Sequence, residues 1–192
     1  MRQTGHLKTT LGLLFGLAWA FGTAAPAPTK TPKTVRFKMN LHSAAFAGLG
    51  AIPVKYTCQG PNVSPPLAWD QEPPGTGSLV LLVEDPDASE KTWVHWVLYN
   101  IPPGLGEIPE GLGPTPVLST GLRQGTNDFR GIGWGGPCPP SGIHRYYFKL
   151  FALDAVLDLE AGLEEPQVLK AIQVHVLAQS TLVGVYQKRL LP

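Results

Sequence analysis

Glycine and proline interrupt this chain so often that it is expected to be rich in turns. There are 22 glycines and 20 prolines among its 192 residues, and both residue types tend to end regular secondary structure. The most heavily interrupted stretch, 103–135, predicts a long irregular segment rather than a helix or a central strand. Loops of that length are uncommon in compact domains and often functional, so we expect either one wall of a site or a poorly ordered surface loop.

Between these interruptions, apolar runs predict a mainly β fold with a minor α part. The continuous apolar run at 78–84 is typical of a strand that is covered on both faces. An apolar stripe at 166–176, with Pro166 at a first helical position, predicts one helix near the end of the chain. Further strands are expected at 35–39, 52–56, 93–101, 145–153 and 181–186, with an edge strand or extended loop at 62–69. We therefore expect one domain spanning 35–192.

The first 25 residues have the pattern of a secretory signal peptide. Arg2 and Lys8 precede an apolar run at 11–22, and small residues follow this run. Cleavage after Ala25 is the preferred interpretation, and an uncleaved membrane anchor is the alternative. Residues 26–34, rich in proline, threonine and lysine, are then expected to form a flexible leader. The sequence therefore predicts a secreted or periplasmic protein.

Charge and cysteine content narrow the classes of partner. The formal net charge is +1 and only 15% of residues are charged, so the chain lacks the basic surface that nucleic-acid binding requires. In an oxidising compartment Cys58 and Cys138 are expected to form a disulfide, the alternative being two buried free thiols. Such a bond would hold the proline-rich turn that precedes His144.

Most of the readable polar chemistry lies in two segments, 85–102 and 136–154. Each segment pairs a proline-containing turn with a histidine near the start of a strand. Strand alternation places Trp93, His95, Val97 and Tyr99 on one face of the first strand, and His144, Tyr146, Phe148 and Leu150 on one face of the second. The two histidines can meet if these strands are neighbours. The alternative interpretation is two unrelated core histidines.

Two carboxylates precede the first of these strands. Asp85 and Asp87 flank Pro86, which restricts the backbone and predicts a well-defined turn. A carboxylate near an imidazole raises the pKa of that imidazole, and a cationic histidine beside tyrosine and backbone donors would form a small anion-binding pocket. A phosphate or a carboxylate group would suit such a pocket. The alternative is an ordinary turn closed by aspartate side chains.

With these residues assembled, the chain resembles the phosphatidylethanolamine-binding protein family, in particular its bacterial Raf-kinase-inhibitor-like branch. The resemblance runs from about 46 to 186 and includes IPVKYTCQGPNVSPPLAW at 52–69, GTNDFRGIGWGGPCPP at 125–140 and HVLAQSTLVGVY at 175–186. It implies a large central antiparallel sheet, a smaller sheet, peripheral helices and one anion pocket at the surface. By position, the pocket residues of the family fall on Asp85, Asp87, Trp93, His95, Pro140, His144 and Tyr146.

Two positions depart from the pattern of the family. Ser89 stands where the first motif usually has proline, and Arg130 stands where the second usually has glycine. Arg130 is expected to add charge near the site, and Asp128 is expected to pair with either Arg130 or Arg145. His175 also matches a position of the family, where we expect a structural role.

Three classes of function fit these residues. The leading prediction is an exported protein that binds a small anionic group, such as a lipid head-group phosphate, without a cofactor. The alternative implied by the resemblance is an inhibitor or regulator of a peptidase or other enzyme through protein contact. A zinc-dependent hydrolase is a third class, because two histidines and two aspartates could bind zinc. Neither a Gly-x-Ser-x-Gly nor a His-Glu-x-x-His motif is present, so no catalytic residue or metal is assigned. Membrane contact is expected only through the signal peptide or a lipid head group.

Overall fold

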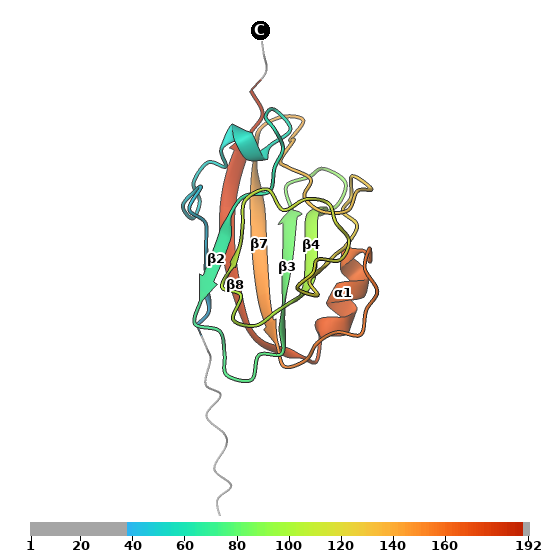
Figure 1. Ribbon diagram of the computed structural model, residues 1–192. Helices are drawn as coiled ribbons and strands as arrows, with labels where there is room; N and C mark the ends of the chain where they lie inside the picture. Colours follow the sequence, from blue (N-terminus) through green and yellow to red (C-terminus); the bar gives the residue numbers. More distant parts are fainter. Residues whose placement is uncertain (1–37, 190–192) are drawn as a thin grey trace, which may run out of the picture. The chain divides into compact units, whose positions relative to one another are not determined.

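The computed structural model describes residues 38–189, which contain two antiparallel sheets and one α-helix joined by long loops (Figure 1). The larger sheet has the order β6-β4-β3-β7-β8 and the smaller has the order β1-β2-β5. The strands are β1 (Asn40–His42), β2 (Leu67–Asp70), β3 (Ser78–Asp85), β4 (Trp93–Ile101), β5 (Glu107–Ile108), β6 (Arg123–Gln124), β7 (Ile143–Leu153) and β8 (Val176–Gln187). The predicted mainly β class, with a large and a smaller sheet, is confirmed.

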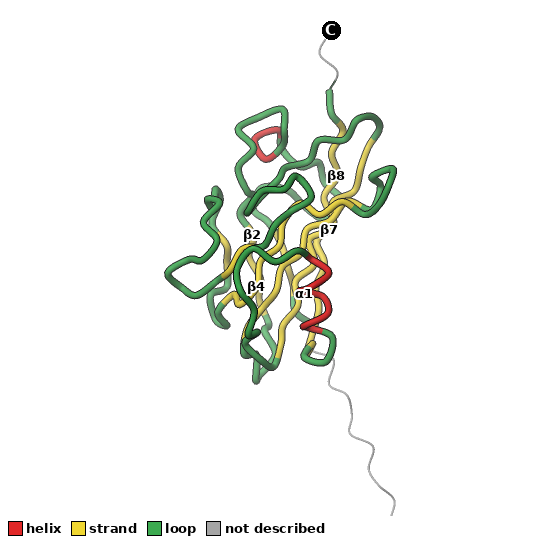
Figure 2. The backbone as a smooth tube through the Cα atoms, turned by 90° about the vertical axis from the view of Figure 1, so that its right-hand side faces the viewer, coloured by secondary structure: helices red, strands yellow, loops and turns green. Residues whose placement is uncertain are grey.

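The centre of the larger sheet is β3, which is buried along its whole length. Val80 and Leu82 pack into the hydrophobic cluster that includes Val168 and Ile172 of the helix α1 (Glu165–Ile172). This helix lies alongside the strands of the larger sheet (Figure 2). Leu79, Leu81 and Val83 pack into the other cluster, which includes residues of the smaller sheet. A strand with an apolar layer on each face needs a continuous apolar sequence, as the run at 78–84 predicted.

The helix is shorter than predicted and the last strand is longer. α1 begins with a capping box in which the side chains of Glu164 and Gln167 bond each other's backbone N–H groups. It ends at Ile172, before the predicted end at 176, because β8 begins at Val176 and pairs there with Leu153 of β7. Pairing of β8 with β7 continues to Gln187, so strand pairing overrides the helical stripe at the end of the predicted helix.

Other predicted boundaries also move. A strand was expected at 52–56, but Val54–Tyr56 form the 3-10 helix η1, and only Ala51 makes a strand bridge, to Val185. The chain enters η1 directly after Pro53, so that bridge does not continue into a strand. Within 103–135 the structure is mostly irregular, as predicted, apart from the two-residue strands β5 and β6. The expected signal peptide, the leader and residues 35–37 of the first expected strand lie outside the described residues. In the described part, no helix has the length and apolar character needed to cross a membrane.

Candidate functional site

The candidate site lies at the C-terminal end of β3, where the sheet order brings two histidines to the same carboxylate. Asp85 is the last residue of β3 and is only 4% exposed. Its neighbours in the sheet are β4, which carries His95, and β7, which carries His144. Nδ1 of His144 lies 2.7 Å from Oδ2 of Asp85. The two histidine strands are therefore not adjacent, and Asp85 stands between them.

A β-bulge turns His95 toward this site. The register between β3 and β4 shifts, so that Val83 lies opposite Trp96 while Glu84 lies opposite Val94, and His95 is the extra residue. His95 therefore packs edge-on against Tyr146, with ring centroids 5.1 Å apart, while Val97 and Tyr99 pack on the side of α1. The prediction that His95 shares a face with Val97 and Tyr99 is wrong, because simple alternation fails at a bulge.

The environment of His95 disfavours the charged form of its ring and fixes the ring orientation. The side chain is 2% exposed, and this burial lowers the pKa of His95, since a low-dielectric surrounding disfavours the charged ring. Nδ1 lies 2.5 Å from the carbonyl oxygen of Gly135, which can only accept, so Nδ1 carries the hydrogen. In the neutral ring Nε2 is then a hydrogen-bond acceptor.

A cavity of about 410 Å³ opens between these groups. Its lining includes the predicted site residues Asp85, Trp93, His95, Pro140 and His144. The cavity also takes its wall from Phe129, in the middle of the long irregular segment, and from Cys138. From 103–135, where a wall of the site was expected, Phe129 lines this cavity.

Asp87 and Tyr146, the other two predicted site residues, do not line the cavity. Oδ2 of Asp87 accepts hydrogen bonds from the backbone N–H and Nε of Arg145, each at 2.9 Å, and Oδ1 accepts from Nη2 at 2.7 Å. The hydrogen bonds from Arg145 lower the pKa of Asp87 to about 2. Tyr146 is fully buried under the ring of His95, and burial raises the pKa of its hydroxyl. Both residues support the lining from outside it.

Two donor groups at this end of the sheet have no partner. Trp93 Nε1 and the hydroxyl of Tyr146 are buried and make no hydrogen bond within the described part of the chain. Buried donors are normally paired with protein or with water. The indole N–H of Trp93 can only donate, so a bound acceptor would satisfy it. Lys91 adds a charge at the edge of the same cavity.

Asp128, next to Phe129 in the chain, pairs differently from either prediction. Its Oδ1 lies 2.7 Å from Nζ of Lys91, and its Oδ2 accepts a 2.7 Å hydrogen bond from the backbone of Val94. The expected pairing with Arg130 or Arg145 is wrong, because Arg145 is engaged by Asp87. Arg130 has φ of +64°, in the left-handed region. That conformation gives a physical reason for the glycine usual at this position in the family pattern.

Phe129 forms an aromatic wall of the cavity, and contacts with the backbone of neighbouring residues hold this wall in place. The ring of Phe129 lies edge-on to Trp93 and His95, with centroids 5.4 Å apart in each case. Oδ1 of Asn127 accepts from the backbone N–H of Phe129 and of Gly131 and so shapes this turn. A Cβ atom on Gly135 would lie 2.4 Å from a ring carbon of Phe129, so the close approach requires glycine there. The motif at 125–140 contains these residues but does not state their contacts.

The disulfide expected between Cys58 and Cys138 is present and belongs to the same wall. The two Cα atoms are 5.4 Å apart. Next to the bond, Cys58 N–H donates to the carbonyl of Pro137 at 3.1 Å, and Gly136 N–H donates to Oδ1 of Asn62 at 2.9 Å. The loop at 136–140 is thereby joined to the loop at 57–62.

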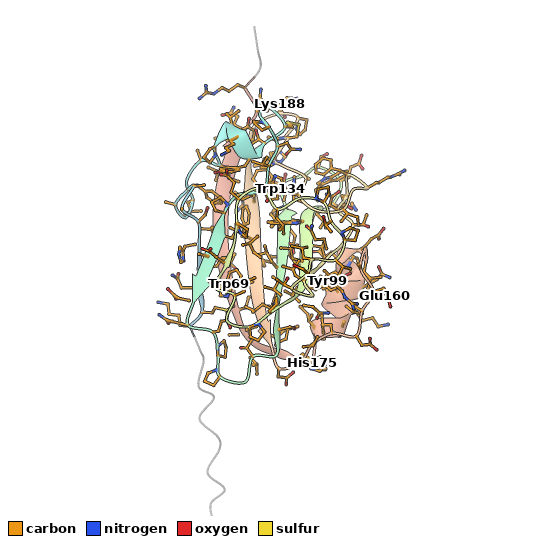
Figure 3. The ribbon with its side chains drawn as sticks, in the orientation of Figure 1. Trp69, Tyr99, Trp134, Glu160, His175 and Lys188 are labelled. Carbon is orange, nitrogen blue, oxygen red and sulfur yellow. A yellow bond between two sulfur atoms is a disulfide. The ribbon has the colours of Figure 1, made fainter. Side chains whose placement is uncertain are left out.

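A second carboxylate and histidine pair lies away from this site. Nδ1 of His175 is 2.8 Å from Oδ1 of Asp154. Figure 3 shows His175 at the opposite end of the sheet from Trp134, whose ring centroid lies 6.4 Å from that of His95. No cluster of three or more potential metal-binding side chains occurs within residues 38–189. His175 and Asp154 therefore form a surface pair that is separate from the candidate site.

Similarity to known proteins covers most of the described residues. A family model described as phosphatidylethanolamine-binding protein matches residues 42–187. A UPF0098 protein of Methanothermobacter thermautotrophicus is 49% identical over 150 residues, which cover 78% of this chain and 99% of that protein. A solved structure of a phosphatidylethanolamine-binding protein homolog from Chlamydia trachomatis has a TM-score of 0.73 and 41% identity, covering 79% of this chain and 98% of that chain. The structure of E. coli YbcL, described as a new member of the mammalian family, also has a TM-score of 0.73, with 30% identity, covering 79% of this chain and 99% of that chain.

Proposed function

The chain belongs to the phosphatidylethanolamine-binding protein family, and on that premise we propose that the cavity beside Asp85 binds a small anionic group such as phosphate. The observation that carries the proposal is the pair formed by Asp85 and His144. Since Nδ1 of His144 is taken by Asp85, Nε2 is the ring nitrogen left for a ligand. An anion binds there most strongly when Nε2 carries a proton, and Asp85 is placed to balance the resulting positive charge.

Neighbouring groups favour an oxygen ligand that both accepts and donates hydrogen bonds. The unpaired N–H of Trp93 and the ammonium group of Lys91 are donors. Nε2 of neutral His95 is an acceptor. A phosphate that keeps one proton can satisfy both kinds of group, whereas a fully ionised ligand would leave Nε2 of His95 without a donor.

The site can be tested by titrating the protein with inorganic phosphate and with phosphorylethanolamine while the imidazole NMR signals are recorded. The signals of His95 and His144 are expected to shift, and His144→Gln should weaken binding roughly tenfold, as expected when one charge-assisted hydrogen bond is lost. His175→Gln is the matched control, because His175 has a similar aspartate partner but lies in no part of this cavity. Unshifted signals of His95 and His144 at millimolar ligand would contradict the proposal.

We propose further that the protein is exported. The support is the disulfide between Cys58 and Cys138, since such bonds persist mainly in oxidising compartments, together with the signal pattern in residues 1–25. Intact mass and N-terminal sequencing of the protein from an exported fraction should show a chain that begins after Ala25. A chain that still begins at Met1 would count against cleavage.

A further inference from the structure

A larger groove, of about 900 Å³, lies next to the anion cavity. The two share Pro140, but no other residue of the predicted anion site lines the groove. Three segments form it: 51–54 at η1, 140–143 at the start of β7, and 185–189 at the end of β8. The groove therefore follows the outer edge of β8, which is the last strand of the larger sheet.

The backbone of Val185 shows which way this edge faces. Its N–H donates to the carbonyl of Gly50 at 2.9 Å, and its carbonyl accepts from the N–H of Ile52 at 2.8 Å. These groups therefore point away from β7. In an antiparallel ladder alternate residues point their backbone groups the same way, so those of Gln187 also face the outer edge.

Gln187 lies between two parts of the edge that are already closed. On one side the segment 50–52 pairs with Val185, but the chain then turns into η1, and no backbone hydrogen bond in the described residues joins that segment to Gln187. On the other side the side chain of Gln59 bonds both backbone groups of Arg189, at 2.7 and 2.8 Å. The N–H and carbonyl of Gln187 are thus exposed in the groove as one open position for a strand bridge.

The side chains around this position are apolar along the groove and basic at its end. Ile143 is 63% exposed and Val54 is 42% exposed, so both offer apolar surface to a segment bound in the groove. Lys188 and Arg189 are exposed, and neither takes part in an ion pair with another described residue. Lys188 stands at the opposite end of the molecule from His175 (Figure 3).

We propose that this groove binds an extended acidic polypeptide segment of another protein, which forms a strand bridge with Gln187. The exposed edge favours a polypeptide, because a peptide backbone offers a donor and an acceptor at the spacing of the bridge and can continue along the groove. Apolar side chains of the segment would pack on Ile143 and Val54, and acidic ones would lie beside Lys188 and Arg189. This docking site is separate from the anion cavity and does not depend on it.

The probe is a short labelled peptide of alternating valine and glutamate, added to the full chain, and the readouts are its binding and the amide NMR signal of Gln187. Binding is expected to shift that signal and to slow exchange of that amide with solvent. Gln187→Pro removes the N–H and should weaken binding severalfold, the range expected for one lost hydrogen bond. Gln187→Ala, which keeps the N–H, should bind normally.

Charge variants test the choice of partner. Replacing both Lys188 and Arg189 with glutamate should weaken peptide binding roughly tenfold. The control is Lys170→Glu, at an exposed position of α1, which should have no effect on peptide binding. His144→Gln should leave peptide binding unchanged, which separates this site from the anion cavity. The proposal is overturned if a valine and lysine peptide binds equally well, if Gln187→Pro binds like the parent, or if only anionic lipid vesicles shift the Gln187 amide.

Discussion

The two carboxylates at the end of β3 have different partners although they are two residues apart. Asp85 is buried and holds His144, whereas Asp87 is partly exposed and holds Arg145. The difference follows from the turn, in which the backbone N–H of Asp87 donates to Oδ1 of Asp85 at 2.8 Å. One carboxylate therefore faces the cavity, and the other ties the turn to the start of β7.

Asp87→Asn should destabilise the protein in a pH-dependent way. The pKa of Asp87 falls from 3.8 to about 2 on folding, chiefly through its hydrogen bonds with Arg145. A carboxylate whose pKa is lowered by folding stabilises the protein at pH values above its pKa in the unfolded chain. This stabilisation is lost as the pH falls from 3.8 toward 2. Because the pair is partly exposed, we expect a loss of about 1 kcal/mol near neutral pH. Urea unfolding of both proteins across this range should show the difference shrinking in acid. A constant difference would contradict this account of the pair.

The residue types of the site could be predicted from motifs, but not all of their positions. Asp85, His95 and His144 line the cavity, as the matched motifs implied, while Tyr146 lies beneath it. His95 reaches the cavity only through a bulge, and no alternation pattern encodes a bulge. Phe129 was missed because its position depends on the turn around Asn127.

At the scale of elements, the strands with a strong apolar pattern were predicted well. The expected strand at 93–101 coincides with β4, and 78–84 differs from β3 by one residue. Short elements such as β5 and β6 were not predicted, because two-residue strands depend on a neighbouring strand rather than on their own sequence. The last strand was expected only over 181–186, whereas pairing with β7 extends β8 from Val176 to Gln187.

The start of α1 contains a carboxyl group that should make the protein less stable at higher pH. Burial, followed by hydrogen bonding and repulsion from Glu84, raises the pKa of Glu165 from 4.5 to about 8, and Oε1 of Glu165 has no other described partner. Glu84 is itself held by Lys149, whose Nζ lies 2.5 Å from Oε2. A carboxyl group whose pKa is raised by folding makes its full contribution to stability at pH values below its pKa in the unfolded chain. This contribution is lost as the pH rises toward 8.

Glu165→Gln should therefore remove a pH-dependent loss of stability. Between pH 4.5 and 8 the parent protein should lose on the order of 1–2 kcal/mol of unfolding free energy that the variant retains. Glu160→Gln, at an exposed position before the helix, is the control and should follow the parent. Denaturant unfolding at several pH values measures the three curves, and parallel curves for the parent and Glu165→Gln would refute the prediction.

At the scale of the whole molecule, the site depends on segments that are far apart in sequence but meet at one end of the larger sheet. The end of β3 supplies Asp85, the irregular segment supplies Phe129, and the start of β7 supplies His144. The loop at 57–62 contributes by holding the wall at 136–140 through the disulfide. The order of the strands brings the ends of β3 and β7 together. Backbone hydrogen bonds from Asp128 to Val94 and from Gly135 to His95 attach the irregular segment to β4, and the disulfide fixes the loop at 57–62.

Replacing both Cys58 and Cys138 with serine should lower stability and weaken anion binding together. The bond links residues separated by 80 positions, so restoring freedom to the unfolded chain should cost up to about 4.5 kcal/mol of unfolding free energy. Binding of phosphate should also weaken, because Cys138 and Pro140 line the cavity and the loop that carries them loses its attachment. Reductant should have the same effects on the parent and none on the double variant. If stability falls but phosphate affinity does not, the wall is held by the hydrogen bonds of Asn62 and Pro137 alone.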